Sequence, residues 1–237
     1  MNAPVRAMAT PLAAVAWDVD GTLVDSEPLH LRALLAVCAA QGVSIADFGT
    51  TPFVGVSITE VWRRIGARFP GGPKQGEAAF YAAVSQAYLE RVADLQPRAH
   101  AVAVVRALDA AGIAQCAVSN SNRATVMANL RQLGIAGAMA CIVTLDDVSE
   151  PKPAAAPYRL ACATLGLDTR RCLAVEDSAS GLASARAAGL RTALYTVEPG
   201  WQNWIDLADH ALASLAEVPA LLGLALPAAA PAASLRP

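Results

Sequence analysis

Apolar and polar residues follow two different rhythms along this chain. The uninterrupted apolar run at residues 13–17 predicts a buried strand near the start. Three segments then carry apolar residues at helical spacing, and the first of these helices is predicted to end near Gly42. The three apolar faces are Leu29, Leu34, Val37 and Cys38; Ile58, Val61, Trp62 and Ile65; and Phe80, Val84, Tyr88 and Val92. One strand followed by three helices is therefore expected first.

From about residue 97 onward, helical patterns alternate with short apolar runs. The pattern predicts a helix that ends at residue 111 and further helices at 123–133, 157–165 and 179–188, with strands at 113–118, 141–144, 172–175 and 191–195. Such alternation is typical of a parallel sheet that helices cover on both faces. We therefore predict an α/β fold with a doubly wound parallel sheet, into which the three earlier helices are inserted.

The composition limits the partners that this protein can have. Of the 237 residues, 55% are hydrophobic and 16% are charged, and the formal net charge is −2. Because there is no basic excess, we expect no nucleic-acid partner. No uninterrupted apolar run of about 18 residues occurs, so we expect no membrane-spanning helix. The five cysteines are odd in number and widely spaced, which favours reduced thiols and a cytoplasmic protein. We expect a monomer or a weak homodimer.

Two carboxylates, those of Asp18 and Asp20, follow the first predicted strand, and Gly21 comes next. In an open α/β sheet, ligands bind at the carboxyl ends of the strands. A sharp turn at Gly21 can direct both acids into one pocket, where one attacks a substrate and the other moves protons. The same residues could also form an acidic turn or part of a calcium loop. The rest of the chain distinguishes these interpretations.

Polar residues also follow three of the later predicted strands. Ser119 and Asn120 follow one strand, Lys152 follows the next, and Glu176 and Asp177 follow the one after that. Each alone is explained as a helix cap or a turn residue. Lys152 is notable because the chain has sixteen arginines and only two lysines, which suggests a need for a compact ammonium group. Their joint placement favours one shared site.

Together these residues supply what phosphoryl transfer through an aspartyl-phosphate requires. Asp18 is the candidate nucleophile, and Asp20 is the candidate general acid and base. Ser119 and Lys152 are candidates for gripping the phosphoryl oxygens. Mg²⁺ prefers hard oxygen ligands. Its candidate ligands are a backbone carbonyl and the side chains of Asp18, Glu176 and Asp177.

The chain resembles the haloacid dehalogenase superfamily, in the branch that has a helical cap inserted after the first strand. Four motifs of that family occur in order: Asp18-Val19-Asp20-Gly21-Thr22, Ser119-Asn120-Ser121, Lys152-Pro153 and Glu176-Asp177-Ser178. The resemblance implies a Rossmann-like core of residues 1–24 and 97–226 and a mobile cap at 25–96. The Ala- and Pro-rich end of the chain, residues 227–237, is expected to form a flexible tail. It also implies that Asp20 gives its backbone carbonyl to Mg²⁺, and we assign Gly21, Thr22 and Asn120 to phosphate binding.

Residue 20 separates the chemistries of this superfamily, because its dehalogenases and phosphonatases lack an acid there. Asp20 therefore favours phosphate esters, and the resemblance implies a phosphatase acting on a small phosphorylated metabolite, most plausibly a sugar phosphate. His30 ends the segment Asp25-Ser26-Glu27-Pro28-Leu29-His30, which is similar to one in sugar phosphatases and β-phosphoglucomutase. We assign His30 to substrate contact or proton relay; the alternative is a structural histidine between cap and core.

Two other functions stay open. The cap of β-phosphoglucomutase normally carries Gly-x-Ser-Arg, whereas this chain has Gly55-Val56-Ser57-Ile58 and so lacks an arginine suited to a distal phosphate. Arg63, Arg64 or Arg68 could replace that arginine, although solvated surface arginines are the simpler explanation. A non-catalytic phosphate-sensing module on the same fold is the third hypothesis. The retention of both acids in the first motif argues against it.

Overall fold

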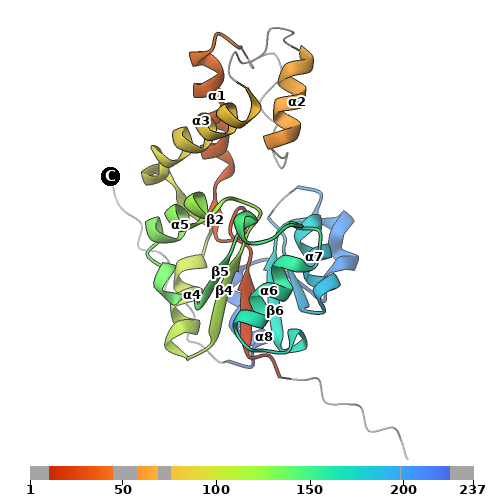
Figure 1. Cartoon of the computed structure of the whole chain (residues 1–237). Helices are drawn as coiled ribbons and strands as arrows, with labels where there is room; N and C mark the ends of the chain where they lie inside the picture. Colours follow the sequence, from red (N-terminus) through yellow and green to blue (C-terminus); the bar gives the residue numbers. More distant parts are fainter. Residues whose placement is uncertain (1–10, 45–57, 69–75, 198, 225–237) are drawn as a thin grey trace, which may run out of the picture.

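The computed structural model describes residues 11–44, 58–68, 76–197 and 199–224, and a six-stranded parallel sheet forms the centre of this part (Figure 1). The strands are β1 (Ala14–Trp17), β4 (Ala114–Val118), β5 (Cys141–Val143), β6 (Cys172–Glu176), β7 (Arg191–Tyr195) and β8 (His210–Leu212). Their order across the sheet is β5-β4-β1-β6-β7-β8. The fully buried β1 pairs in parallel with β4 on one side and β6 on the other, so the predicted doubly wound sheet is confirmed.

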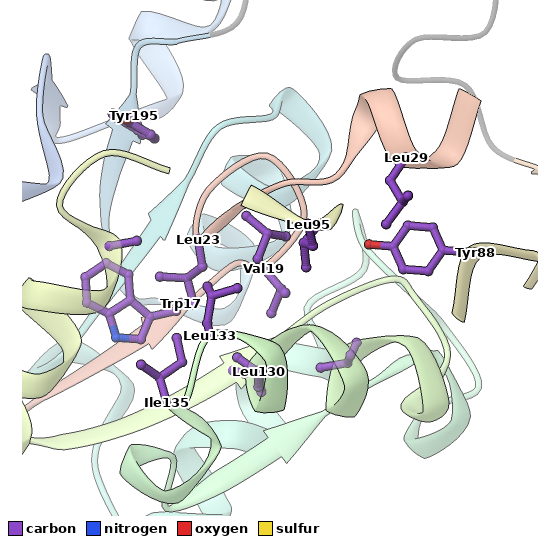
Figure 2. Close-up of a cluster of buried hydrophobic side chains, with 14 of the residues drawn as sticks. Trp17, Val19, Leu23, Leu29, Tyr88, Leu95, Leu130, Leu133, Ile135 and Tyr195 are labelled. Atoms are coloured by element: carbon purple, nitrogen blue, oxygen red, sulfur yellow. The ribbon is translucent and has the colours of Figure 1, made fainter. Parts of the chain in front are cut away.

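Helices cover both faces of the sheet, because alternate side chains of each strand point to opposite sides. Val15 and Trp17 of β1 belong to one hydrophobic cluster, with α4, α5 and α8, whereas Ala14 and Ala16 belong to another, with α6 and α7. Figure 2 shows Trp17 inside the first cluster. The bounds of these helices are α4 (Ala101–Ala110), α5 (Arg123–Gln132), α6 (Ala156–Thr164), α7 (Ala179–Ala188) and α8 (Val218–Leu221).

A helical insertion leaves the sheet after β1 and returns before α4 (Figure 1). Two short strands that pair antiparallel, β2 (Val24–Asp25) and β3 (Gln96–Pro97), frame it. Within the described residues it contains α1 (Glu27–Ala40), α2 (Ile58–Arg68) and α3 (Glu77–Leu89). The α1 helix packs along α3, and the ring centroid of Trp62 in α2 lies 5.1 Å from that of Phe80 in α3. The predicted apolar faces therefore pack against each other.

The structure corrects several predicted elements. The α3 helix ends at Leu89, so Val92 begins a separate 3-10 turn instead of continuing that helix. Thr144 lies outside β5, because its N–H and its hydroxyl both donate to the Asp147 carboxylate and start another turn. Strands β2, β3 and β8 are missing from the prediction, since two or three partly exposed residues carry no readable period.

Other expectations concern the chain as a whole. None of the helices in the described ranges is long and apolar enough to cross a membrane. All five cysteines are free thiols, and four of them are buried. The predicted tail at 227–237 lies outside the described residues. The predicted domain boundaries stay predictions, although the helical insertion does lie between the two segments assigned to the core.

Candidate active site

The sequence-predicted site residues meet at the carboxyl ends of three neighbouring strands. Asp18 directly follows β1, Ser119 directly follows β4, and Glu176 is the last residue of β6. Because β1 lies between β4 and β6, these ends are adjacent. Lys152 joins them from the segment between β5 and α6, through a hydrogen bond from its ammonium Nζ to the Val118 carbonyl (2.8 Å). Residues from all four motifs therefore share one site.

Lys152 connects two of the predicted acids. Its Nζ donates to Asp18 Oδ1 at 2.7 Å and to Glu176 Oε1 at 2.6 Å, and only 3% of its side chain is exposed. The Asn120 amide fixes the backbone of Lys152, since Oδ1 accepts from the Lys152 N–H and Nδ2 donates to its carbonyl. Asn120 thus positions Lys152 here, and its assignment to phosphate binding stays a prediction.

Burial changes the charge state of this cluster. Removal from water, followed by the neighbouring charge of Glu176, raises the pKa of Asp18 to about 7, against the opposing effect of Lys152. Burial acts to lower the pKa of Lys152, but the charges of Asp18 and Glu176 outweigh it and raise that pKa. The ammonium therefore stays charged and offsets part of the acidic repulsion.

The acidic residues can hold a metal ion. Asp18, Glu176 and Asp177 each offer a carboxylate oxygen, and the three oxygens lie within 4.8 Å of one another. Asp18 Oδ2 is buried and has no hydrogen-bond partner among the described residues. Gly21 has a φ of +90°, and a Cβ there would lie 1.8 Å from Asp177 Oδ2. These closely spaced hard oxygen donors fit a divalent cation.

Glu176 is held from several sides. Tyr158 in α6 donates its hydroxyl to Glu176 Oε1 at 2.5 Å, and Ser178 donates to Oε2 at 3.1 Å. Ser178 is also the N-cap of α7, where its Oγ accepts from the Gly181 N–H. Tyr158 is not among the residues that the sequence predicted for the site. A tyrosine on the otherwise apolar face of α6 is the signal that could have indicated a buried polar partner.

Asp20 faces a different set of partners from those of Asp18. Its Oδ2 accepts from Ser119 Oγ (3.1 Å) and Ser121 Oγ (2.8 Å), and its Oδ1 accepts from Asn129 Nδ2 (3.3 Å). His30 Nε2 lies 3.9 Å from Oδ1. Burial acts to raise the pKa of Asp20, but its contacts with His30 and Ser121 lower it to about 2. Asp20 is therefore ionised in this arrangement.

Several assignments to substrate remain predictions. The Ser119 hydroxyl donates to Asp20 and accepts from the Ser121 N–H, so it supports the turn after β4. The Thr22 hydroxyl is buried and has no partner among the described residues. His30 stacks on Tyr88, with ring centroids 4.3 Å apart, at the junction of the insertion and the core. The stacking on Tyr88 fits the alternative interpretation, in which His30 is a structural residue between cap and core. His30 also lies close to Asp20, so its assignment to substrate contact or proton relay stays a prediction.

Asn129 and its partner Tyr88 are likewise not among the predicted site residues. Tyr88 donates its hydroxyl to Asn129 Oδ1 at 3.0 Å, and both residues are buried. The signal was available, because Asn129 stands at helical spacing between Val126 and Leu133 on the apolar face of its helix. An amide in such a position needs polar partners.

The cap segment that separates phosphatase from mutase is only partly described. Gly55, Val56 and Ser57 lie outside the described residues, as do the side chains of Ile58 and Arg68. Both Arg63 and Arg64 bind the Glu60 carboxylate on the same helix, with Nε···O distances of 2.6 and 2.7 Å. These two arginines are thus engaged in ion pairs within α2.

The doubly wound sheet and its acidic site define an α/β enzyme fold, and comparisons with known proteins identify the family. Residues 12–189 match the model of the haloacid dehalogenase-like hydrolases. The chain is 31% identical over 219 residues to a plasmid-encoded phosphoglycolate phosphatase of Cupriavidus necator, covering 90% of this chain and 94% of that protein. It is 32% identical over 225 residues to hexitol phosphatase B of Escherichia coli, covering 91% of this chain and 100% of the other.

A solved structure supports the same grouping. A mutant of CbbY from Rhodobacter sphaeroides, crystallised in complex with xylulose-(1,5)bisphosphate, superposes with a TM-score of 0.77 and 26% identity. The match covers 89% of this chain and 99% of that one. This chain therefore belongs to the haloacid dehalogenase-like hydrolase family, and the resemblance predicted from the four motifs is confirmed.

Proposed function

We propose that this hydrolase is a Mg²⁺-dependent phosphatase that acts on a small phosphorylated metabolite, such as a sugar phosphate, through a phosphoaspartate at Asp18. The observation that carries the proposal is the buried Asp18 carboxylate: Lys152 binds Oδ1, whereas Oδ2 has no partner among the described residues. A nucleophile needs a lone pair that no donor occupies. Oδ2 meets that requirement beside a fixed ammonium group.

The proposed reaction has two steps. Asp18 attacks phosphorus, the bond from phosphorus to the leaving oxygen breaks, and Asp20 gives its proton to that oxygen. Water then attacks phosphorus, its proton passes to Asp20, and the bond to Asp18 breaks with release of inorganic phosphate. Asp20 is ionised in the described arrangement, which is the state that the second step requires. The first step requires the protonated form of Asp20.

Asp18, Asp177 and Glu176, with the backbone carbonyl of Asp20, would hold Mg²⁺. The bound ion supplies positive charge toward the phosphoryl oxygens. Lys152 is placed to neutralise further charge there, because its ammonium already lies against Asp18. Asn120 holds Lys152 beside the Asp18 nucleophile. Ser119 and the Gly21-Thr22 turn hold Asp20 near the same carboxylate.

The substrate class and the setting are part of the proposal. Two relatives are named for the hydrolysis of small phosphate esters, and the CbbY structure contains a sugar bisphosphate. We expect the helical insertion to act as a cap over the substrate, because it lies next to the carboxyl ends of the strands (Figure 1). The five free thiols support a reducing compartment such as the cytoplasm. A monomer or weak homodimer is expected.

A panel of phosphomonoesters tests this function. Purified protein is assayed for phosphate release from 2-phosphoglycolate, hexitol phosphates, hexose phosphates and xylulose 1,5-bisphosphate, with Mg²⁺ or with a chelator. We expect Mg²⁺-dependent turnover of at least one of these esters. Absence of turnover with every ester would favour the non-catalytic module and overturn the proposal.

Phosphorus NMR of the same reactions distinguishes hydrolysis from isomerisation. A phosphatase releases inorganic phosphate from β-glucose 1-phosphate without forming glucose 6-phosphate. If glucose 6-phosphate formed faster than free phosphate, the enzyme would be a mutase. An anchor for a second phosphate would then have to be sought in the insertion.

A further inference from the structure

A chain of buried polar contacts runs from the helical insertion to Asp20. Tyr88 lies near the end of α3, and its hydroxyl donates to Asn129 Oδ1 at 3.0 Å in α5 of the core. The same amide donates from Nδ2 to Asp20 Oδ1 at 3.3 Å. Tyr88 and Asn129 are 1% and 0% exposed. In Figure 2 the Tyr88 ring enters the hydrophobic cluster beside Leu29 of α1. We call these two contacts the Tyr88–Asn129 bridge.

The bridge leaves Asn129 one favourable orientation. An amide has one acceptor oxygen and one donor nitrogen on opposite sides. Tyr88 supplies a hydroxyl proton, and burial raises the pKa of Tyr88, so the hydroxyl stays a donor. A flipped amide would face the Asp20 carboxylate with its own oxygen and leave two lone pairs in conflict. The Asp20 carboxylate, which can only accept, thus selects this amide orientation, and the Tyr88 hydroxyl donates to the amide oxygen on the other side.

Both ends of the helical insertion meet at this point. His30 lies in the first turns of α1, its ring stacks on Tyr88 at 4.3 Å, and its Nε2 is 3.9 Å from the Asp20 oxygen that Asn129 binds. The other Asp20 oxygen accepts hydrogen bonds from Ser119 and Ser121 of the core. Asp20 Oδ1 is therefore linked to the insertion in two ways, through His30 and through the Asn129 amide that Tyr88 binds.

We infer that Asn129 is a positioning residue for Asp20, and that Tyr88 anchors Asn129 Oδ1 in the place from which Nδ2 donates to Asp20. The packing of the end of α3 against α5 then determines the position of Asp20, the proposed general acid and base. The inference rests on the proposed function, because it assigns Asn129 and Tyr88 to the proton transfers of that reaction. It adds a means by which movement of the insertion changes the catalytic carboxyl without any contact to substrate.

Tyr88→Phe tests the bridge, because it keeps the buried ring and removes only the hydroxyl. Proton donation matters for a poor leaving group and little for an activated aryl phosphate. We expect kcat for an alkyl phosphate substrate to fall on the order of tenfold with KM changed less than about twofold. Turnover of p-nitrophenyl phosphate should stay within about twofold of wild type. Asn129→Ala, which keeps Tyr88, should show the same dependence on leaving group.

Ser85→Ala is the matched control. Asn122 donates to Ser85 Oγ at 2.9 Å, so this variant also removes a hydrogen bond between α3 and the core, but neither residue contacts Asp20. We expect Ser85→Ala to turn over the alkyl phosphate and p-nitrophenyl phosphate at the wild-type rates. In an Asp20→Asn background, Tyr88→Phe should cause no further loss, because the group that it positions is gone. The inference would be overturned if Tyr88→Phe lowered turnover of both substrates equally. It would also be overturned if Tyr88→Phe caused as large a loss of turnover in the Asp20→Asn background as in wild type.

A spectroscopic measurement tests the bridge independently of turnover. The side-chain amide resonances of Asn129 should shift in Tyr88→Phe and in Asp20→Asn, but not in Ser85→Ala. If they shift and wild type hydrolyses none of the phosphate esters, the proposed function fails and the bridge stands. If wild type is active and these resonances do not respond, the bridge fails and the proposed function stands.

Discussion

Asp18 illustrates how a functional residue acts against stability. Its carboxylate is buried beside those of Glu176 and Asp177, and within this cluster one ammonium, that of Lys152, offsets their repulsion. Burying three carboxylates beside one ammonium is unfavourable, and Asp18 Oδ2 has no hydrogen-bond partner among the described residues. The arrangement is therefore explained by its chemistry and not by its contribution to the folded state.

Asp18→Asn is expected to abolish turnover without damaging the fold. The amide keeps the shape but is a poor nucleophile, so kcat should fall by more than about a thousandfold. Because one buried charge is removed, the melting temperature of the metal-free protein should stay the same or rise. Phosphate release and thermal unfolding measure the two effects. Activity within about tenfold of wild type, in protein free of contaminating phosphatase, would exclude the phosphoaspartate.

At the scale of elements, the first turn of α7 shows how closely backbone and site are packed. A Cβ added at Gly181 would lie 1.9 Å from the carboxylate of Glu176. Only a residue without a side chain lets α7 begin so close to β6. Gly66 in α2 is the opposite case, since nothing lies within 4 Å of the Cβ that would be added there.

Gly181→Ala and Gly66→Ala should therefore have opposite effects. Gly181→Ala must displace Glu176, and we expect a loss of about 1–3 kcal/mol in the free energy of unfolding together with a loss of activity. Gly66→Ala improves helix propensity and should stabilise by up to about 1 kcal/mol. Urea unfolding of both variants measures the difference. Equal stabilities would mean that α7 moves away from Glu176 at little cost.

The junction of the helical insertion with the core is a second element that supports the site. Arg98 follows β3, and its Nε donates to the Gly21 carbonyl at 2.8 Å, while its Nη2 lies 3.5 Å from Asp25 Oδ1 in β2. One guanidinium thus connects the returning end of the insertion to the turn that carries Asp20.

Arg98→Ala is expected to lower kcat about tenfold, because small displacements of catalytic groups are costly. Arg32→Ala is the matched control: Arg32 contacts Asp94 at 3.7 Å with half of its side chain exposed, and exposed pairs contribute little. Its activity should equal that of wild type. Steady-state kinetics of the two variants at equal folded fraction decide the point, and indistinguishable values would remove Arg98 from the supporting structure of the site.

At the scale of the whole molecule, the acidic site links stability to metal and pH. The pKa of Asp18 is raised from its ordinary value to about 7 in the metal-free fold. A group with a raised folded-state pKa contributes stability that is present below its unfolded pKa, and this stability is lost as pH rises through about 7. A metal ion requires the ionised carboxylate, so protons compete with the metal below pH 7.

Millimolar Mg²⁺ should therefore raise the melting temperature more at pH 8 than at pH 6. Binding to the folded state alone stabilises by mass action, and the apparent affinity should strengthen by up to about tenfold over this range. Thermal shifts with and without Mg²⁺ at the two pH values measure it. Asp18→Asn should show smaller shifts with little dependence on pH. Equal shifts at both pH values in wild type would contradict the role of Asp18 as a titrating ligand.

The elements most accurately predicted were those with a clear local period. Helix α7 and strand β7 occupy the predicted residues, and the apolar run before Asp18 is the central strand. Much of the candidate site was predictable for a related reason: parallel strands present their carboxyl ends at one edge, so acids that follow β1 and β6 must be near each other. Short strands such as β8 carry too few residues for a period to be read.

The sequence by itself determined the alternation of strands and helices and the order of the chemical groups along the chain. Only the tertiary structure decided which polar side chains form hydrogen bonds or ion pairs with one another. Asn129 and Asp20 are 109 positions apart, and Tyr88 and Asn129 are 41 apart. Periodicity is a property of neighbours in sequence, whereas these contacts depend on how the helical insertion packs against α5. No local pattern encodes that packing.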